Sequence, residues 1–237
     1  MAAPKKTSVI DMSGRWRLNR KLSDDVNEVY KMQGTPFWTR KLLSFMTIEQ
    51  EYTNNAYCLP FSDDVVFGFR QTVRRPWFGG CKFNIPMNEN MYILDNEDRA
   101  LVLPAPLGPV RLRCRYDFLN TGGTPAYTPG EKLATEKSTV QIGQVASCFE
   151  STMEMDPDVG SPERAVMIEV IESLSKAGKA AGWRSTVEWG FEMIAGEKRL
   201  VKWNVIVKGC QVAKAKMVYD YVGEPIVRSN SGPLQTD

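Results

Sequence analysis

The sequence predicts a mainly β protein: an antiparallel up-and-down barrel with a pair of helices near its N-terminus and one additional helix near 162–176. The strongest observation is the stretch 184–223, where apolar and polar residues alternate through three consecutive segments. Alternation with period two is typical of strands that bury one face. The dipeptides Ala195-Gly196 and Lys208-Gly209 separate the segments and favour the tight turns of hairpins. We therefore expect a three-stranded meander.

The buried face of this meander, here called the dry face in contrast to the solvent-exposed wet face, is predicted to combine large rings with small residues. Its members are Val187, Trp189, Phe191, Met193, Val201, Trp203, Val205, Val207, Ala213, Ala215, Met217, Tyr219 and Tyr221. In the second strand this places Lys202 and Asn204 on the wet face. A curled sheet with such a dry face is suited to enclosing an apolar space.

The N-terminal fifty residues add the helices. Residues 1–12 are expected to form a flexible leader, and a first strand follows from Ser13. Ser23-Asp24-Asp25 is typical of a helix N-cap, and Gly34-Thr35-Pro36 separates this helix from a second one. The second helix has an amphipathic stripe that includes Phe37, Trp38 and Phe45. We interpret the two helices as a helix–turn–helix lid.

The rest of the chain is divided into strands, apart from one further helix. The expected strands are 44–52, 63–73, 81–85, 90–94, 100–103, 110–119, 138–143 and 145–155. Pro162 stands where proline favours the first turn of a helix, which predicts a helix to about Lys176. Residues 13–226 then form a single barrel domain, and 227–237 form a loose tail.

Composition excludes several classes of chemistry. There is no histidine among the 237 residues, which excludes Ser-His-Asp and Cys-His catalysis and histidine metal sites. The net charge of +2 argues against a nucleic-acid partner. The five cysteines contain no C-x-x-C pair, which favours free thiols in a reducing compartment. Without a spanning apolar run or a signal peptide, we expect a cytoplasmic protein with no membrane span, no metal and no cofactor.

Two ends of the chain resemble a known group. The first segment carries Gly14-Arg15-Trp16, then Leu22-Ser23-Asp24-Asp25, Gln33-Gly34 and Arg40-Lys41. The C-terminal segment carries Trp189-Gly190-Phe191-Glu192, Val207-Lys208-Gly209 and Val218-Tyr219-Asp220-Tyr221. Together they resemble fungal lipocalin-like proteins, related to the fatty-acid-binding (calycin) barrels. The resemblance covers about 13–52 and 184–222 and implies a cavity for an apolar ligand beneath a helical lid.

Candidate site residues follow from which side chains are expected to face the barrel interior. Polar groups there can hydrogen-bond a ligand carbonyl, or they can be satisfied by backbone or buried water. The catalytic candidates are Tyr116, Tyr219 and Gln71. The ligand-binding candidates are Trp38, Phe67, Phe69, Tyr92, Phe149, Trp189, Phe191, Trp203, Met217 and Tyr221. Each aromatic residue either lines a cavity or fills a core, and Trp38 faces either ligand or barrel rim.

Three arginines share one face of a single predicted strand. Arg111, Arg113 and Arg115 alternate with Leu112 and Cys114. They form either an anion clamp or a solvated outer face with carboxylate partners. The apolar residues on the opposite face favour the solvated alternative.

Two functions fit these observations. The first is a cofactor-independent cyclase or isomerase that shapes an apolar intermediate of fungal secondary metabolism, because the lipocalin-like proteins it resembles include pericyclases. Such a reaction requires a shaped cavity and one or two donors on a carbonyl, and it requires no histidine. The second is a non-catalytic carrier of a small hydrophobic metabolite. The sequence favours the cyclase, since the predicted interior is aromatic rather than aliphatic.

Overall fold

The computed structural model describes most of the chain. The described residues are 1–4, 7–9, 11–58, 65–74, 77–78, 81–82, 89–103, 107–119, 164–175 and 181–225. Within them, only the backbone is described for 54–58, 65–74, 77–78, 81–82, 89–91, 116–119 and 164–165.

A single curled antiparallel sheet dominates the described residues. It has ten strands in the order β6-β3-β2-β1-β12-β11-β10-β9-β8-β7. The strands are β1 (Gly14–Leu18), β2 (Glu49–Cys58), β3 (Val65–Arg74), β6 (Glu89–Ile93), β7 (Arg99–Leu103), β8 (Gly108–Leu119), β9 (Arg164–Ser173), β10 (Trp183–Ile194), β11 (Glu197–Lys208) and β12 (Gln211–Gly223). The strands β4 (Trp77–Phe78) and β5 (Cys81–Lys82) form a separate small hairpin.

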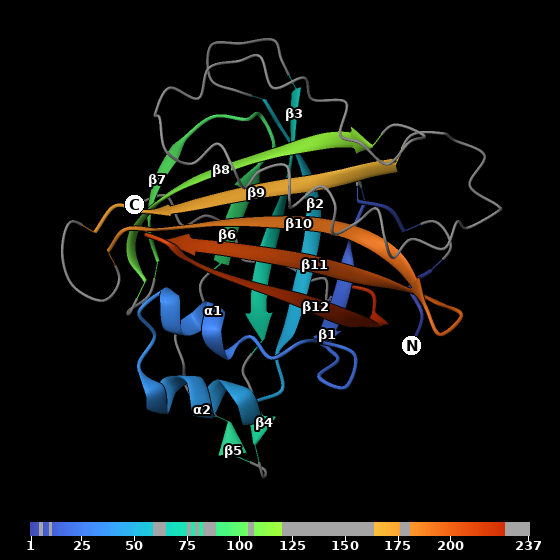
Figure 1. The fold of residues 1–237 in the computed structure, drawn as a ribbon. Coiled ribbons are helices and arrows are strands. Elements are labelled where there is room, and N and C mark those ends of the chain that lie inside the picture. The colour runs from blue at the N-terminus through green and yellow to red at the C-terminus, as the bar shows by residue number, and fades with distance from the viewer. Residues whose placement is uncertain are drawn as a thin grey trace, which may run out of the picture.

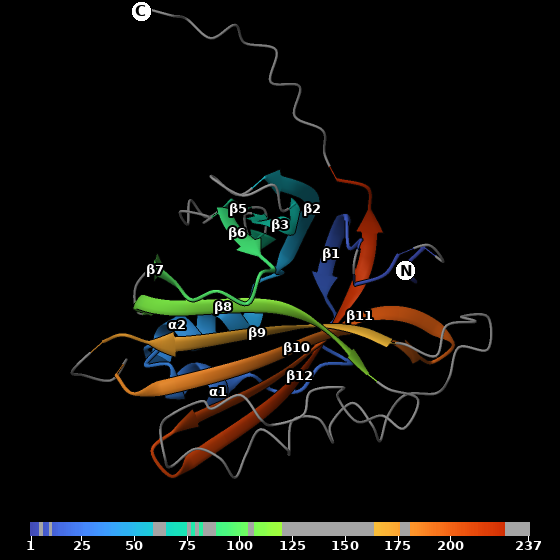
Figure 2. The same cartoon turned by 90° about the horizontal axis from the view of Figure 1, so that it is seen from above.

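The sheet curls so that its two halves face each other across a common interior. Figure 2 shows β2, β3 and β6 on one side and β8 to β11 on the other. The two edge strands of the sheet, β6 and β7, follow each other in the chain and are joined by the short connection 94–98, so the two edges of the sheet come together at this connection. The predicted antiparallel up-and-down barrel is thereby confirmed.

The C-terminal meander forms as predicted, with one shift in a turn. Ala195 and Gly196 both have positive φ (53° and 76°), and Ile194 pairs with Glu197 across them. The second hairpin pairs Lys208 with Gln211, so its loop is Gly209-Cys210, one residue later than expected. Gly209 provides the positive φ of 59° that this loop requires.

The prediction of an inward-facing Trp203 is wrong, because the hairpin register places it on the outer face. Trp189 pairs with Lys202, so these two side chains point the same way, into the barrel. Trp203 pairs with Glu188 on β10 and Lys216 on β12, and its indole donates to the Glu192 carboxylate at 2.8 Å. In β11 the apolar stripe faces outward, whereas Lys202 and Asn204 face inward.

The predicted helix near 162–176 is also wrong. Residues 164–173 form β9, which pairs with β8 on one side and β10 on the other. The segment Val166-Met167-Ile168-Glu169-Val170-Ile171 is rich in β-branched residues, which favour a strand with neighbours on both edges. Because of this pairing, Met167, Glu169 and Ile171 share the inner face with Trp189 and Val187.

The two helices lie across one end of the barrel (Figure 1). They are α1 (Asn27–Met32) and α2 (Phe37–Phe45). The Lys208 ammonium donates to the Met32 carbonyl at 3.1 Å, which ties α1 to the end of β11. Of the predicted N-cap cluster, Asp25 accepts the backbone N–H of Asn27, the first residue of α1, at 2.9 Å. The Asp24 carboxylate and the Ser23 hydroxyl instead accept backbone N–H groups of β12, at 2.7 and 2.8 Å.

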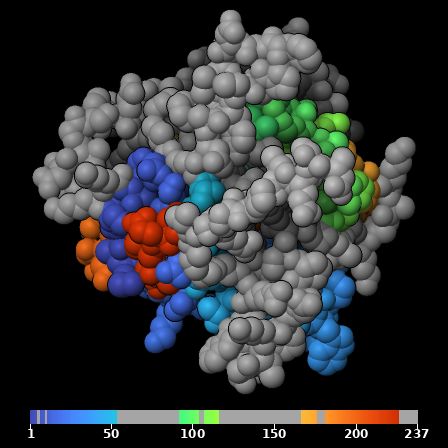
Figure 3. Space-filling view, turned by 180° about the vertical axis from the view of Figure 1, so that it is seen from behind, coloured from blue at the N-terminus to red at the C-terminus, as the bar shows by residue number. Residues whose placement is uncertain are grey.

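The opposite end of the barrel is packed with aromatic rings. Trp16 lies 5.7 Å from Phe191 and 5.2 Å from Tyr221, between ring centroids. Residues of the expected leader close this end: Met12 and Val9 are buried against the same cluster. The Met1 carbonyl accepts the Tyr221 amide at 3.1 Å, and Figure 3 shows the N-terminal segment beside β12. The division into leader, barrel and tail remains a prediction.

Among the described residues, no helix has the length and apolar character required to cross a membrane.

Candidate functional site

A cavity of about 160 Å³ lies in the barrel interior at the end covered by α1. Apolar side chains from α1, β10 and β12 form part of its wall, and polar side chains from β2, β6, β9 and β11 form the rest. The lining residues are Val26, Val29, Tyr30, Gln50, Tyr92, Glu169, Val187, Trp189, Lys202, Asn204, Met217 and Tyr219. An apolar enclosure with a few convergent polar groups is the usual form of a small-molecule site.

Lys202 is the central polar residue of this cavity. Its side chain is only 5% exposed. The ammonium donates to the Gln50 amide oxygen at 3.1 Å and to the Tyr52 hydroxyl at 2.8 Å. It also stands 3.4 Å from the centroid of the Trp189 ring, whose face attracts a cation. The Tyr52 hydroxyl in turn donates to Gln50, so the three residues form a closed hydrogen-bonded group.

Glu169 provides the second buried charge. It is 4% exposed and accepts a hydrogen bond from the Trp189 indole at 3.0 Å. A further hydrogen bond comes from Tyr92. Trp189 therefore lies between the carboxylate, which contacts its N–H, and the ammonium, which contacts its ring face.

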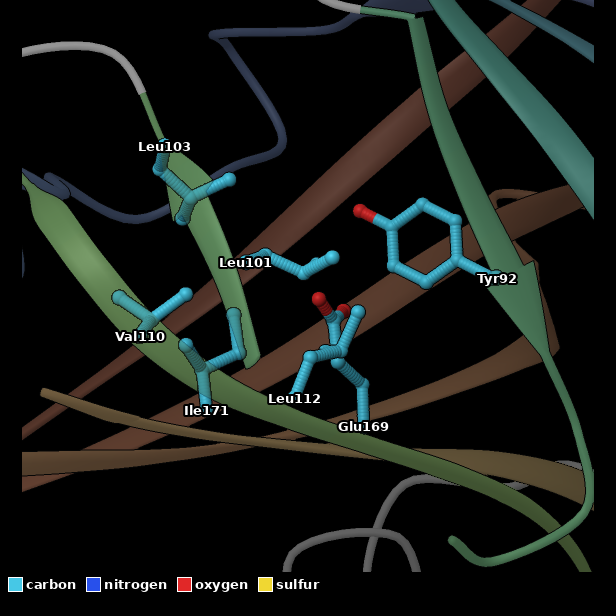
Figure 4. A pocket seen from close by; sticks show the side chains of 7 residues that line it. All are labelled: Tyr92, Leu101, Leu103, Val110, Leu112, Glu169 and Ile171. Carbon is cyan, nitrogen blue, oxygen red and sulfur yellow. The ribbon is translucent and has the colours of Figure 1, made fainter. Parts of the chain in front are cut away.

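A smaller cavity of about 50 Å³ shares Tyr92 and Glu169 with the larger one. Its other lining residues are aliphatic: Leu101, Leu103, Val110, Leu112 and Ile171. Figure 4 shows the Glu169 carboxyl group and the Tyr92 ring pointing into this space from opposite sides. The carboxyl group therefore has an aliphatic surface on one side and the Lys202 group on the other.

Burial shifts the pKa of both charged residues toward neutrality. It raises the pKa of Glu169 to about 6, against the opposing effects of Lys202 and of hydrogen bonds from Trp189 and Tyr92. It lowers the pKa of Lys202 to about 7, against the opposing charge of Glu169. Burial also raises the pKa of Tyr52 and of Tyr219 above the usual range for a phenol. Both tyrosines are therefore hydrogen-bond donors at neutral pH.

Four of the predicted ligand-binding or catalytic residues line the larger cavity: Tyr92, Trp189, Met217 and Tyr219. The Tyr219 hydroxyl lies 3.7 Å from the Met217 sulfur. Tyr92 and Trp189 therefore line a cavity, which was the first of the two predicted alternatives for the aromatic residues. Their rings also contact each other, with centroids 5.8 Å apart.

Other predicted residues lie away from the cavity. Phe191 and Tyr221 pack on Trp16 at the barrel end opposite the helices. These two rings therefore fill a core, which was the second predicted alternative. Trp38 is 80% exposed and contacts Phe37 edge-on at 5.4 Å. Trp203 is on the outer face, as described above.

The remaining predicted residues cannot be placed by their side chains. Phe149 lies outside the described residues, and only the backbone is described for Gln71, Phe67, Phe69 and Tyr116. Their roles remain predictions.

The sequence did not indicate Glu169, Lys202, Gln50 or Tyr52 as site residues. Glu169 was assigned to a helix, and Lys202 was assigned to the wet face of its strand. One signal was present: a two-residue loop at Ala195-Gly196 fixes the pairing of β10 with β11 and so places Lys202 beside Trp189.

The three arginines of β8 form the solvated outer face that the apolar pattern favoured. The Arg113 guanidinium donates to Asp98 at 2.8 Å, and Arg111 lies 3.6 Å from Glu172. Leu112 and Cys114 face inward and are buried. Among the described residues, no group of three or more acidic or thiol side chains is arranged to hold a metal ion.

Comparison with curated proteins gives a match along nearly the whole chain. No family model matches. A protein of Mollisia scopiformis described as "Probable pericyclase scpY" is 23% identical over 224 residues, which is 94% of this chain and 95% of that protein. This chain is similar to a probable pericyclase along nearly its whole length. Together with the strand order, this match confirms the resemblance to fungal lipocalin-like proteins.

Solved structures with a similar course of the chain are fatty-acid-binding proteins. Fatty-acid-binding protein 1 of Echinococcus granulosus has a TM-score of 0.43 and 10% identity, over 90% of this chain and 98% of that one. The fatty acid transporter REP1-NXSQ has a TM-score of 0.42 and 10% identity, over 89% and 96%. The strand order and register of this chain itself establish its fold.

Proposed function

We propose that this protein is a cofactor-independent cyclase of the pericyclase type, which folds a largely apolar intermediate of fungal secondary metabolism inside the barrel. The observation that carries the proposal is the larger cavity, in which the buried Lys202 ammonium is a hydrogen-bond donor held in place by Gln50 and Tyr52 and faces a wall that is apolar in part. The end-to-end similarity to a probable pericyclase supports the same reaction class.

A pericyclic cyclisation suits the residues that are present. Bonds form and break in one concerted step, so no proton or electron has to pass to the protein. The protein contributes by restricting the substrate to conformers in which the reacting carbons are close. It contributes further by hydrogen bonding to a carbonyl conjugated with a reacting double bond, which stabilises charge that grows in the transition state. Lys202 is the proposed donor, positioned by Gln50 and Tyr52.

The volume of the cavity indicates how a substrate would bind. About 160 Å³ is smaller than the roughly 300–1,000 Å³ of pockets that enclose a drug-sized ligand. We infer that the cavity holds the reacting ring-forming part of the substrate. The rest of the chain would pass between the strands and α1, where Val26, Val29 and Tyr30 border the cavity.

The proposal is tested with a synthetic linear polyene that carries a diene and an α,β-unsaturated ketone. The expected result is cyclisation at least about tenfold faster than in buffer, equivalent to about 1.4 kcal/mol, with one diastereomer enriched. Product ratios are measured by chiral liquid chromatography. Met217→Trp, which fills the cavity, should abolish the acceleration. Val212→Trp is the matched control, because Val212 is an exposed residue of the same strand.

A non-catalytic carrier is the second candidate and gives a different result. A carrier would bind the polyene, as shown by quenching of tryptophan fluorescence, while the rate and the product ratio stayed those of the buffer reaction. Binding lost in Met217→Trp together with an unchanged rate in the unsubstituted protein would replace the cyclase by the carrier.

A further inference from the structure

We propose that the Lys202 side chain forms a Schiff base with the carbonyl carbon of an aldehyde or ketone ligand in the larger cavity. The inference rests on the proposed function only in placing the ligand in this cavity. It deepens that function, because it names the ligand class and a covalent step.

The position of Lys202 in the fold provides the first support. Its amine lies in the wall of a cavity and is reached from no other described surface, since the side chain is 5% exposed. None of the ion pairs among the described residues involves Lys202. By contrast, Lys216 on the outer face is held by the Glu192 carboxylate at 2.6 Å. The Lys202 nitrogen is therefore hydrogen bonded to two neutral groups, the Gln50 amide and the Tyr52 hydroxyl. Loss of its proton, which exposes the lone pair, breaks no ion pair with a carboxylate.

Electrostatics provides the second support. Burial lowers the pKa of Lys202 to about 7, so the neutral, nucleophilic amine is far more populated at neutral pH than it is in an exposed lysine. An ordinary exposed lysine, with a pKa near 10.4, is neutral in less than about 0.1% of molecules at the same pH. Buried lysines of this kind are the usual Schiff-base residues.

The neighbours of the amine fit the steps of the reaction. The nitrogen lone pair attacks the carbonyl carbon, and a proton moves from nitrogen to oxygen to give a carbinolamine. The hydroxyl group of the carbinolamine then takes up one proton and departs as water. A carbon–nitrogen double bond forms in its place. The Tyr52 hydroxyl, 2.8 Å from the nitrogen, can give that proton and recover it from the nitrogen. No oxidant or reductant is required, since an amine and a carbonyl give an imine and water.

The imine nitrogen then takes up a proton from solvent, equivalent to the one that the resting ammonium lost. In sum, an ammonium and a carbonyl give an iminium and water, and the positive charge is conserved. The Trp189 face, 3.4 Å from the nitrogen, attracts the iminium as it attracts the ammonium. An iminium withdraws electrons from a conjugated double bond more strongly than a hydrogen-bonded carbonyl does. Formation of the Schiff base would therefore accelerate the cyclisation proposed above.

Reductive trapping tests the proposal without requiring turnover. The full-length protein is incubated with octanal and sodium cyanoborohydride at neutral pH, and octyl-lysine is located by peptide mass spectrometry. The probe is a saturated aldehyde, which avoids conjugate addition to cysteine. The proposal predicts modification of Lys202 at least about tenfold faster than of Lys216, the internal control. Prior filling of the cavity by Met217→Trp should remove this preference.

Two outcomes decide the matter. Preferential modification of Lys202 supports the Schiff base, provided that the other lysines react at the same rates in Lys202→Arg as in the unsubstituted protein. Modification of Lys202 no faster than of Lys216 overturns it, whatever the folding of the variants. In that case the cyclase proposal still stands if the unsubstituted protein accelerates cyclisation of the polyene ketone. A reactive Lys202 without any acceleration would instead mean a carbonyl-binding protein that does not catalyse cyclisation.

Discussion

At the scale of single residues, the barrel interior is defined by two buried charges placed on either side of one indole. Trp189 donates its N–H to Glu169 and presents its ring face to Lys202. Buried charges of this kind are costly unless they are hydrogen bonded. Both have partners here, Gln50 and Tyr52 for Lys202 and Trp189 and Tyr92 for Glu169. Because they face a cavity, we assign them to function rather than to stability.

The two charges predict how the free energy of unfolding depends on pH. The pKa of Lys202 is lower in the folded chain than in the unfolded one, so the unfolded chain binds more protons between about pH 7 and 10.5. Stability should therefore rise with pH across this window. The pKa of Glu169 is raised from 4.5 to about 6, so its contribution should decrease as the pH rises through that range. The pair thus contributes least between about pH 6 and 7.

Urea denaturation of the unsubstituted protein and of Lys202→Met at pH 7, 8 and 9 measures this effect. The difference in unfolding free energy between the two should change with pH in favour of the unsubstituted protein as the pH rises. A difference that stays constant from pH 7 to 9 would show that Lys202 keeps its ordinary pKa in the folded state.

At the scale of elements, the two hairpins were well predicted, whereas the inner face of β11 was not. The alternation in β11 is real, and both of its faces are covered in part by apolar residues: Leu200 and Ile206 inward, Val201 and Val205 outward. Because the face with fewer charges was taken as the inner one, Trp203 was predicted to face the ligand. The loop length, rather than hydrophobicity, determines which residues of neighbouring strands point the same way.

The prediction for 162–176 failed for a related reason. Apolar residues at Val166, Val170 and Leu174 satisfy a helical spacing, and a proline stands at the expected first position. The same segment alternates with period two once its pairing is known. The segment forms a strand because β8 and β10 pair with it on both sides, and β-propensity depends strongly on such context.

The short motif Gly14-x-Trp16 has a packing explanation that predicts a mutational effect. Gly14 has a φ of +145°, and a Cβ there would lie 2.6 Å from a ring carbon of Tyr221. Gly14→Ala should therefore destabilise the protein by about 1–3 kcal/mol, through overpacking and backbone strain. Chemical denaturation measures the change.

Gly182→Ala provides a matched control for this effect. Gly182 also has a positive φ, +69°, but a Cβ there would meet no atom within 4 Å. Gly182→Ala should therefore lower the free energy of unfolding only through backbone strain, by about 1 kcal/mol. If the two alanine variants lost equal stability, contact with Tyr221 would not be the reason for glycine at position 14.

At the scale of the whole molecule, one end of the barrel is filled by aromatic rings, whereas the helix end holds both a cavity and a buried cluster around Val29, Met32 and Trp183. Rings from β1, β10 and β12 fill the first end, together with Met12 from the N-terminal segment. The helix end contains the larger cavity (Figure 1). We infer that the ring-filled end contributes to stability alone, whereas the helix end also binds the ligand.

Two methionine substitutions test this division. Met12→Ala removes a fully buried side chain and should cost about 2–5 kcal/mol of stability, while octanal labelling of Lys202 stays unchanged. Met217→Ala enlarges the cavity wall and should cost less stability, because Met217 is only partly buried. It should alter the labelling rate. Thermal unfolding and peptide mapping provide the two measurements. Equal effects of both variants on labelling would mean that the ends are coupled.

The sequence alone determined the class of fold, the C-terminal meander, the helix pair and the absence of histidine chemistry. These are local properties, since hydrophobic period and turn residues act over short separations. The tertiary structure decided the site. Lys202 and Glu169 lie 33 positions apart in the sequence and enter one cavity only because β9, β10 and β11 pair in a particular register. Register is a relation between strands, and a shift of one residue would turn both charges to the outer face.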